Sequence, residues 1–356
     1  MTDFLLALYR GDFLDSTDIK SFTIEELEEK IVQLGLPKFR AKQIFSWLHK
    51  GVESFDEMTN LSKDLREVLS KSFVIRSVSI KKRLESCVDD TVKYLYELCD
   101  GEYIESVLMK YKHGYSICIS TQVGCRMNCS FCASGLNGLS RNLTPSEMLS
   151  QIMVAQKDNN IRISNVVLMG MGEPLDNYDN TIRFLKLVSD ENGLNIGLRH
   201  ISLSTSGHVA GIEKLMKEKL PITLSISLHA PTDEIRSSMM PVNKKWNIES
   251  LISACKEYIK VTNRRISFEY ALISGVNDSD LCARQLFKLL KGMLCHINLI
   301  PANPVKENDF QKPDNAKVQH FCDLLNNYGI TTTVRRTLGA DIDASCGQLR
   351  RKEIEN

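Results

Sequence analysis

The sequence has no long hydrophobic run, and this absence restricts where the protein can work. No apolar stretch approaches the ~18 residues that a membrane-spanning helix requires. The opening segment, MTDFLLALYRGDFLDSTD, also lacks the basic start and the small-residue cleavage site of a secretory signal. We therefore expect a cytoplasmic protein that has no membrane partner.

An excess of charge of either sign is also missing. The chain carries 45 Lys and Arg against 44 Asp and Glu, a net charge of +1, so its overall charge does not indicate a nucleic-acid-binding protein. Short basic clusters remain, and each is typical of an ordinary solvated surface but could also contact phosphates. The clusters contain Lys38, Arg40, Lys42, Lys244, Lys245, Arg264, Arg265, Arg335 and Arg336.

Internal repeats and low-complexity tracts are absent, and the 356 residues, 43% of them hydrophobic, suffice for a large domain with a smaller module. The first eighty residues have helical patterns. TIEELEEKIVQLG, for example, opens with Thr23 three residues before Glu26, the spacing of a capping box, and ends at Gly35. From about residue 78 to 109 short β-like runs follow, and Asp100-Gly101 predicts a hairpin turn between them.

Apolar strand-like runs then alternate with amphipathic helical segments. LTPSEMLSQIMVAQK has Thr144 as its cap, Pro145 in the first turn and Glu147 in the capping-box position. Repeated βα units predict a parallel sheet buried on both faces, either barrel-like or doubly wound. We predict a partial (β/α) barrel, because the chemically distinctive residues follow strand ends. The strand-like runs are YSICIST, ISNVVLMG, RHISLST, ITLSISL, ISFEYALI, CHINLI and ITTTVRR.

These patterns divide the chain into four parts. Residues 1–80 form a helical accessory domain, and residues 81–110 form a β-hairpin extension. Residues 111–338 form the α/β barrel, and residues 339–356 form a C-terminal segment.

The cysteines do not form pairs typical of a disulfide framework. In a reducing cytoplasm, 11 unevenly scattered cysteines indicate metal binding or thiol chemistry. Cys125, Cys129 and Cys132 are spaced C-x3-C-x2-C directly after the run YSICIST. A structural zinc site needs four ligands, and no second C-x2-C pair supplies them, although packed cysteines or a zinc site with a distant ligand remain alternatives. An iron–sulfur cluster held by three thiolates would keep one iron open for a small molecule.

Polar or glycine-rich loops follow four further strands. LMGMGEP contains Gly170 and Gly172, which would let the backbone approach a ligand, and Glu173, which suits a ligand ammonium group. LSTSG, SLHAP and LIPANP place further polar groups after strands. Each loop alone is typical of a turn or a helix cap, but four at one edge of a sheet indicate a ligand site.

The C-x3-C-x2-C loop resembles that of the radical S-adenosylmethionine (SAM) superfamily. Nearly the whole chain resembles one of its families, the dual-specificity RNA adenosine C2 methyltransferases. The resemblance rests on STQVGCRMNCSFCASG, RNLTPSE, VVLMGMGEPL, LSTSG, SLHAP, NLIPANPVKE and GADIDASCGQL, which occur in this order. It implies a [4Fe–4S] cluster on Cys125, Cys129 and Cys132, with SAM on its open iron. The SAM-contacting positions that match are Gly172, Glu173, Ser204, Ser227, Leu228, His229 and Asn303.

The resemblance also assigns roles to residues that the patterns alone leave open. Cys346 lies among small residues with no apolar periodicity, which indicates a reactive thiol, and by resemblance it accepts a methyl group from one SAM. A second SAM yields the radical that activates this S-methyl group for addition to adenine carbon 2. Cys118 would otherwise be an ordinary buried strand cysteine, and by resemblance it resolves the covalent RNA adduct as a Cys118–Cys346 disulfide. Glu105 matches the proton acceptor, and its alternative is a solvent-facing strand glutamate.

The partners implied are 23S ribosomal RNA and transfer RNA, together with an electron donor of the flavodoxin or ferredoxin kind, and we expect a monomer. The helical domain resembles the family's RNA-binding module. Residues 1–80 nevertheless carry 11 Lys and Arg against 13 Asp and Glu, so we expect RNA to contact a local basic face such as KFRAKQ and the mouth of the barrel.

Two other functions fit parts of the pattern. A sister group methylates carbon 8 of the same adenosine and confers antibiotic resistance, but it tends to have alanine where this chain has Pro174. A non-enzymatic iron–sulfur or zinc protein that binds RNA would leave the Cys118 and Cys346 pair and the SAM-type loops unexplained. We therefore predict a radical SAM methyltransferase acting on adenine carbon 2.

Overall fold

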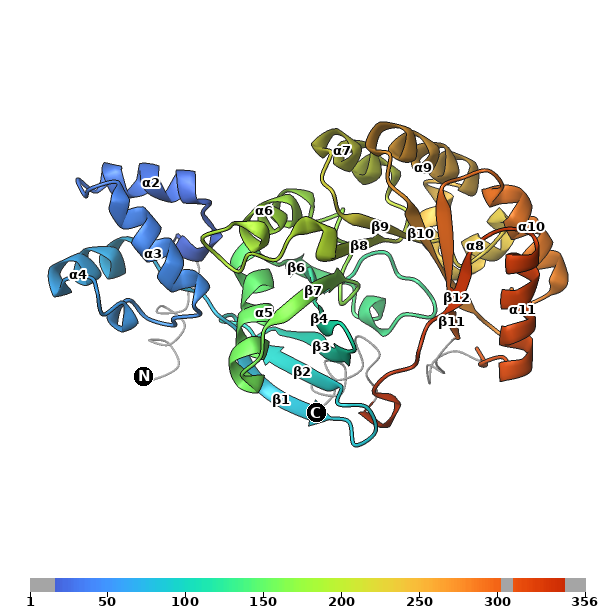
Figure 1. Ribbon diagram of the computed structural model, residues 1–356, viewed down its shortest axis with the longest axis horizontal. Helices are drawn as coiled ribbons and strands as arrows, with labels where there is room; N and C mark the ends of the chain where they lie inside the picture. The colour runs from blue at the N-terminus through green and yellow to red at the C-terminus, as the bar shows by residue number, and fades with distance from the viewer. Residues whose placement is uncertain (1–16, 302–309, 343–356) are drawn as a thin grey trace.

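The computed structural model describes residues 17–301 and 310–342. A small helical unit lies at one end of the molecule and a large α/β unit at the other (Figure 1). Thr23 caps the first long helix with the expected capping box to Glu26, so the predicted start of this helix is confirmed. The helices of the small unit are α2 (Ile24–Gln33), α3 (Phe39–His49) and α4 (Lys63–Ser72).

An antiparallel extension joins the helical unit to the α/β unit. Its strands are β1 (Ser79–Glu85), β2 (Val92–Glu97) and β3 (Tyr103–Tyr111), and β3 also pairs antiparallel with β4 (Gly114–Cys118). The predicted hairpin turn connects β2 to β3, where Gly101 has a φ of 85° that favours glycine.

From β4 onward the strands of the main sheet are parallel. The sheet runs in the order β1-β2-β3-β4-β7-β8-β9-β10-β11-β12, and in the described chain neither β1 nor β12 has a second neighbour, so the barrel is open. All seven strand-like runs found in the sequence form strands, and the prediction of a partial barrel is confirmed. The later strands are β7 (Ile163–Leu168), β8 (Ile201–Thr205), β9 (Thr223–Ser227), β10 (Ile266–Leu272), β11 (Cys295–Pro301) and β12 (Thr332–Val334).

Amphipathic helices connect the parallel strands. Thr144 and Glu147 form the expected capping box at the start of α5, with Pro145 at its first position. Figure 1 shows α7, α9, α10 and α11 along the outer side of the sheet. The helices are α5 (Pro145–Asn159), α6 (Tyr178–Ser189), α7 (Val209–Glu218), α8 (Asp233–Met239), α9 (Ile248–Thr262), α10 (Asp280–Leu290) and α11 (Asn315–Asn327).

Strand β10 is buried on both faces. In β10, Tyr270 stacks on Phe321 of the outer helix α11, with ring centroids 5.6 Å apart. Glu269 points to the opposite, inner face and is only 4% exposed. At β10 the inner face therefore carries a buried carboxylate, whereas the outer face packs against an aromatic ring of a covering helix. Within the described residues, we find no helix with the length and apolar character needed to cross a membrane.

Candidate active site

The three-cysteine loop lies beyond the carboxyl end of β4 and is closed at its base by a short ribbon. Strand β5 (Gln122–Gly124) pairs with β6 (Leu139–Asn142), and the amide of Cys125 donates to the carbonyl of Gly138 at 2.9 Å. Gly124 has a φ of 78°, and a Cβ at this position would lie 2.0 Å from the Gly138 carbonyl oxygen. Only glycine can therefore close the loop in this way.

The cysteines of this loop are shielded from solvent. Cys125 is buried, while Cys129 and Cys132 are half-buried. Burial raises the pKa of the Cys125 thiol to about 12 and also raises the pKa of Cys129. Thiols in such surroundings stay protonated unless a metal centre replaces the proton. The thiols of the loop would therefore lose their protons and become thiolate ligands when a metal centre binds.

The three thiols can be compared with the needs of a single metal ion and of a cluster. A zinc ion needs all its ligands within about 2.3 Å of one point. In residues 17–301 and 310–342, no group of three or more His, Cys, Asp or Glu side chains is placed to hold one ion. In a four-iron cluster each thiolate binds a different iron. Three cysteines in one loop suit the expected cluster, which stays a prediction.

Glu173 joins two of the loops at the carboxyl edge of the sheet. Its side chain is 2% exposed, and its carboxylate accepts hydrogen bonds from the amides of Ser206, at 2.7 Å, and Leu175, at 3.1 Å. Burial raises the pKa of Glu173, and the hydrogen bond from Ser206 opposes this rise. The negative charge of Glu173 also raises the pKa of Cys125 and Cys129. A carboxylate near the cysteine loop suits a ligand ammonium group.

The glycines before Glu173 lie against a neighbouring backbone segment. A Cβ on Gly170 would lie 2.5 Å from the carbonyl oxygen of Ile119, and a Cβ on Gly172 would lie 2.6 Å from the Gln122 Cβ. The close approach that they permit is to this segment, where the Thr121 amide donates to the Met171 carbonyl at 2.8 Å. Contact of either glycine with a ligand stays a prediction.

His229 lies in the loop after β9 and in a left-handed conformation, with a φ of 57°. Its Nδ1 accepts a hydrogen bond from the Ala271 amide at 2.9 Å, and burial lowers its pKa to about 3. The neutral ring therefore carries its proton on Nε2, which is available as a donor. The ring meets Phe131 of the cysteine loop edge-on, with centroids 4.9 Å apart. Nearby, Ser204 and Leu228 are buried and Ser227 is half-buried.

The sequence analysis missed Arg236, which holds these loops together. The Arg236 side chain is fully buried, and burial lowers its pKa to about 10. Its guanidinium donates to the carbonyls of Leu228 at 3.1 Å, Ser206 at 2.6 Å and Ser227 at 3.2 Å. The positive charge of Arg236 also partly opposes the rise in the pKa of Cys129 that burial causes. Arg236 belongs to no recognisable short motif, so only the tertiary structure reveals its contacts.

A second group of reactive side chains lies on the inner face of β2, β3 and β4. Val107 of β3 lies opposite Lys93 on one side and opposite Cys118 on the other. Glu105 comes two residues before Val107 and so shares its face. The Lys93 ammonium lies 3.0 Å from the Glu105 carboxylate, and the two side chains are 0% and 1% exposed. The alternative of a solvent-facing Glu105 is therefore wrong, and Lys93 is a partner that the sequence did not indicate.

The described part of the C-terminal region approaches this group. Leu338 packs against the cluster formed by Val107, Met109 and Cys118. Three residues later, Asp341 accepts hydrogen bonds from the Ser86 hydroxyl at 2.7 Å and the Cys87 amide at 2.9 Å. The chain is thus fixed beside Cys118 just before residues 343–356.

Two predicted site residues, Asn303 and Cys346, lie outside the described residues. The ten cysteines within the described residues are free thiols.

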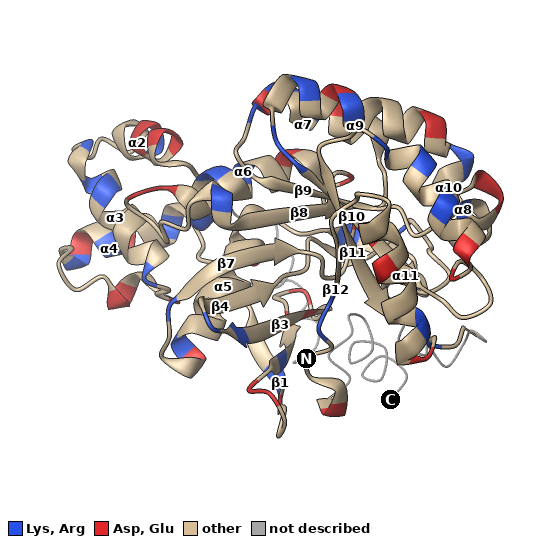
Figure 2. Ribbon diagram, turned by 45° about the vertical axis from the view of Figure 1, so that its right-hand side comes forward, with Lys and Arg blue, Asp and Glu red and all other residues tan. Residues whose placement is uncertain are grey.

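The basic cluster KFRAKQ is partly neutralised. Lys38 pairs with Glu28 at 3.0 Å, and Arg40 donates to Gln43 at 2.8 Å while lying over the ring of Phe39. Helix α2 carries four glutamates and one lysine, whereas α3 carries Arg40 and Lys42 and no carboxylate (Figure 2). The basic residues of KFRAKQ therefore lie at α3, and their contact with RNA stays a prediction.

Comparison with known proteins agrees with this geometry. The model of the radical SAM superfamily matches residues 119–283, and that of the ribosomal RNA large subunit methyltransferase N-terminal domain matches residues 17–75. The probable dual-specificity RNA methyltransferase RlmN of Alkaliphilus oremlandii is 57% identical over 96% of this chain and 100% of its own. That of Clostridium novyi is 54% identical over 95% of this chain and 99% of its own.

A solved structure extends the comparison to the fold. The crystal structure of a radical SAM methyltransferase from Sphaerobacter thermophilus has a TM-score of 0.88 and 42% sequence identity, and the match covers 93% of this chain and 98% of that one. The open parallel barrel and the three-cysteine loop at its carboxyl edge thus define a radical SAM enzyme. Within that class, the chain belongs to the family of dual-specificity RNA methyltransferases named RlmN. The alternative of a non-enzymatic RNA-binding protein is not favoured.

Proposed function

We propose that the protein methylates carbon 2 of adenosine in 23S ribosomal RNA and in transfer RNA, with Cys346 as the methyl carrier. The single observation that supports this most is the inner-face group around Cys118. A buried thiol, a buried carboxylate and the start of the C-terminal segment lie together there, through Cys118, Glu105 and Leu338. An enzyme that joins its substrate to a cysteine needs a second thiol and a proton acceptor at that point.

The cofactors would be a [4Fe–4S] cluster and SAM at the carboxyl edge of the barrel. Cys125, Cys129 and Cys132 would hold the cluster, and Glu173 and the Nε2–H of His229 offer an acceptor and a donor to SAM. The other proposed SAM contacts are Gly172, Ser204, Ser227, Leu228 and Asn303. When bound, SAM supplies the methyl group and, with an electron from the cluster, the radical that an electrophilic ring carbon requires.

The chain's own residues would complete the reaction. Cys346 holds the transferred carbon and becomes joined through it to the adenine. Glu105 would accept the proton that the ring loses. Cys118 would then attack the Cys346 sulfur as a thiolate, so that the carbon–sulfur bond breaks and the freed carbon keeps its electron pair and takes up a proton. This attack releases methylated RNA and forms a Cys118–Cys346 disulfide, which an external reductant must reopen in each cycle.

The remaining parts of the proposal concern partners and setting. An electron donor of the flavodoxin or ferredoxin kind would reduce the cluster. We propose a cytoplasmic enzyme that acts as a monomer on RNA. We also propose the domain limits expected from the sequence, which are residues 1–80, 81–110, 111–338 and 339–356.

The test is the identity of the methylated nucleoside. The reconstituted protein is incubated anaerobically with SAM, a reductant and 23S ribosomal RNA, and the nucleosides are analysed by mass spectrometry against 2-methyl and 8-methyl standards. We expect 2-methyladenosine from the wild-type protein and none from Cys346→Ala. Formation of 8-methyladenosine would contradict the proposed position, and unchanged product from Cys346→Ala would contradict the proposed carrier.

A further inference from the structure

A cavity of about 690 Å³ opens at the amino ends of the parallel strands, the end of the barrel opposite the cysteine loop. Its outer wall comes from residues that directly precede strands. Arg199 precedes β8, and Arg264 and Arg265 precede β10. We call this the amino-edge cavity. Its volume lies within the range of about 300–1,000 Å³ typical of small-ligand sites, so it has room for one nucleotide.

The wall of the amino-edge cavity is strongly basic. It contains four arginines and three histidines but one carboxylate, that of Glu269. Glu269 already accepts hydrogen bonds from Asn298 at 2.7 Å and Ser267 at 2.9 Å. Among the described residues, Arg199, Arg264, Arg265 and Arg335 take part in no salt bridge. Burial raises the pKa of Glu269 and the charge of Arg335 partly opposes this rise, so Arg335 has a carboxylate in its neighbourhood. Guanidinium groups that form no salt bridge can attract an anionic ligand.

Hydrogen bonds to backbone carbonyls anchor two of these arginines, Arg264 through its side chain and Arg335 through its own backbone amide. The Nε of Arg264 donates to the Ile222 carbonyl at 2.8 Å, and the Arg335 amide donates to the Leu299 carbonyl at 2.8 Å. Arg264 and Arg335 are half-buried, whereas Arg199 and Arg265 are exposed. Positive charge therefore extends from the surface into the barrel.

The inner end of the cavity reaches the proposed reaction centre. Met109, Tyr111 and Met169 line the cavity and also belong to the apolar group packed around Cys118. A base inserted from the amino edge would thus approach Cys118 from the side opposite the cysteine loop.

We propose that the amino-edge cavity is the entrance for RNA, with the target adenosine unstacked into it and the flanking phosphates held by Arg199, Arg264 and Arg265. This inference rests on the proposed function and adds the route and the contacts of the substrate. Unstacking a base costs a few kcal/mol, and phosphate contacts on either side of the flipped nucleotide offset that cost.

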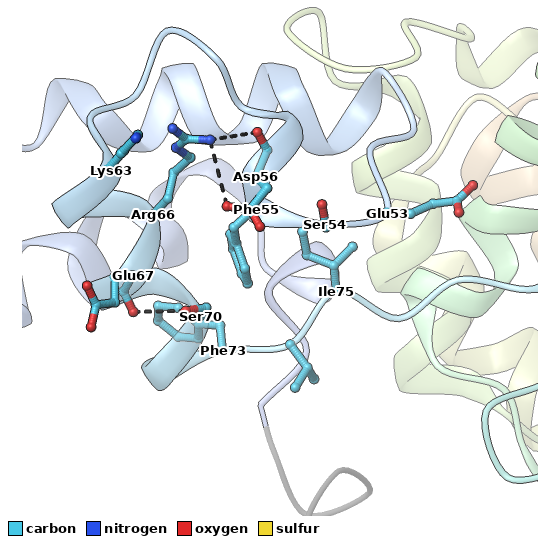
Figure 3. A pocket seen from close by; sticks show the side chains of 11 residues that line it. Glu53, Ser54, Phe55, Asp56, Lys63, Arg66, Glu67, Ser70, Phe73 and Ile75 are labelled. Carbon is cyan, nitrogen blue, oxygen red and sulfur yellow. Dashed lines mark hydrogen bonds and ion pairs between the residues drawn. The ribbon is translucent and has the colours of Figure 1, made fainter.

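A second hollow, on the helical unit, lacks the chemistry for this role. This hollow of about 600 Å³ is lined by three carboxylates, from Glu53, Asp56 and Glu67, and by two basic residues, Lys63 and Arg66 (Figure 3). Arg66 donates to the Asp56 carbonyl at 2.7 Å and faces its carboxylate. The balance of charge there is negative, so it repels phosphate.

The test compares two charge-matched double variants of the full chain. The rim variant is Arg199→Ala/Arg265→Ala, and the control is Arg284→Ala/Lys288→Ala, which removes two exposed cations from α10. Binding of 23S ribosomal RNA and of an unmodified tRNA transcript is measured by filter retention at several salt concentrations. We expect the rim variant to bind RNA about tenfold more weakly, with a salt dependence lower by about one to two ions, because phosphate contacts release counterions. The control should bind within about twofold of wild type.

The outcomes separate this inference from the proposed function. A rim variant that binds RNA as tightly as wild type, with the same salt dependence, would overturn the entrance while leaving methylation by the wild type intact. Equal weakening of the rim variant and the control would also overturn it, because any surface cation would then suffice. If the rim variant alone binds weakly but the wild type forms no 2-methyladenosine, the entrance stands and the proposed reaction fails. Production of 5′-deoxyadenosine in the absence of RNA should be equal in all three proteins. This equality would show that the substitutions leave the cofactor site at the carboxyl edge intact.

Discussion

The two ends of the barrel differ in how their polar groups are held. At the carboxyl edge, Glu173, His229 and Arg236 are buried, and each is fixed by hydrogen bonds to backbone groups. At the amino edge, Arg199 and Arg265 are exposed and have no salt bridge within the described chain. The first arrangement suits small cofactors that must be held in one geometry, and the second suits a large, variable polyanion. In this account, the carboxyl edge of the barrel positions the cofactors and the amino edge binds the RNA.

The largest effect on stability is expected from breaking the buried ion pair of Lys93 and Glu105, which lies on the barrel wall between the two ends. Lys93→Met would leave the Glu105 carboxylate buried without its 3.0 Å partner. We expect the free energy of unfolding to fall by about 3–5 kcal/mol, because the buried carboxylate loses an oppositely charged neighbour. Urea denaturation of the cluster-free protein measures this change.

The matched control for this pair is the double variant Lys93→Met/Glu105→Gln, which removes both charges. It should recover most of the lost stability, since a neutral pair needs no charge compensation. If the double variant is no more stable than Lys93→Met, the ion pair is not the reason for the loss.

Breaking the rigid carboxyl edge should have the next largest effect. Arg236→Met removes the hydrogen bonds to the Ser206, Ser227 and Leu228 carbonyls. We expect a loss of about 3 kcal/mol in the free energy of unfolding and weaker SAM binding by the reconstituted protein, measured by calorimetry. The matched control Arg284→Met, at an exposed position on α10, should stay within about 0.5 kcal/mol of wild type. Similar losses in both variants would contradict a special role for Arg236.

The smallest expected effect concerns pH. The pKa of His229 is lowered by burial from 6.5 to about 3, so between these values the unfolded chain binds a proton that the folded chain excludes. The free energy of unfolding should therefore fall by up to about 1.4 kcal/mol per pH unit as the pH decreases below 6.5. His229 should contribute no such dependence well above pH 6.5.

His229→Asn isolates this contribution. Asparagine tolerates the φ of 57° and can accept the hydrogen bond from the Ala271 amide, but it does not titrate. Denaturation midpoints between pH 8 and pH 5 should depend less on pH in this variant than in wild type. An unchanged slope would mean that His229 does not titrate on unfolding in this range.

Local patterns predicted much of the fold. The capping boxes at Thr23 and Thr144 and the turn at Gly101 depend on residues close in sequence, and the structure contains all three. The seven strands could be found because nearly continuous apolar runs mark strands covered on both faces. The cysteine loop could be found for a similar reason, because its three ligands lie within eight residues of one another.

Features that depend on distant residues were missed or misjudged. Lys93 lies on a different strand from Glu105, and strand periodicity does not show which face is enclosed. Sequence also cannot show that Gln122 lies beside Gly172. Arg265 and Arg335 were noted as basic pairs that could contact phosphates, but each comes from a separate βα unit, and only the folded sheet brings them to one cavity with Arg199.

The account as a whole requires that RNA, Cys118 and Cys346 meet inside the barrel. Its most direct test is Cys118→Ala incubated with SAM, a reductant and 23S ribosomal RNA, followed by nuclease digestion and mass spectrometry of peptides. The control is Cys87→Ala, which removes an exposed thiol and should turn over normally. We predict that Cys118→Ala accumulates an adenosine-modified peptide containing Cys346 and releases no methylated RNA. Normal turnover of Cys118→Ala without an adduct would contradict the account.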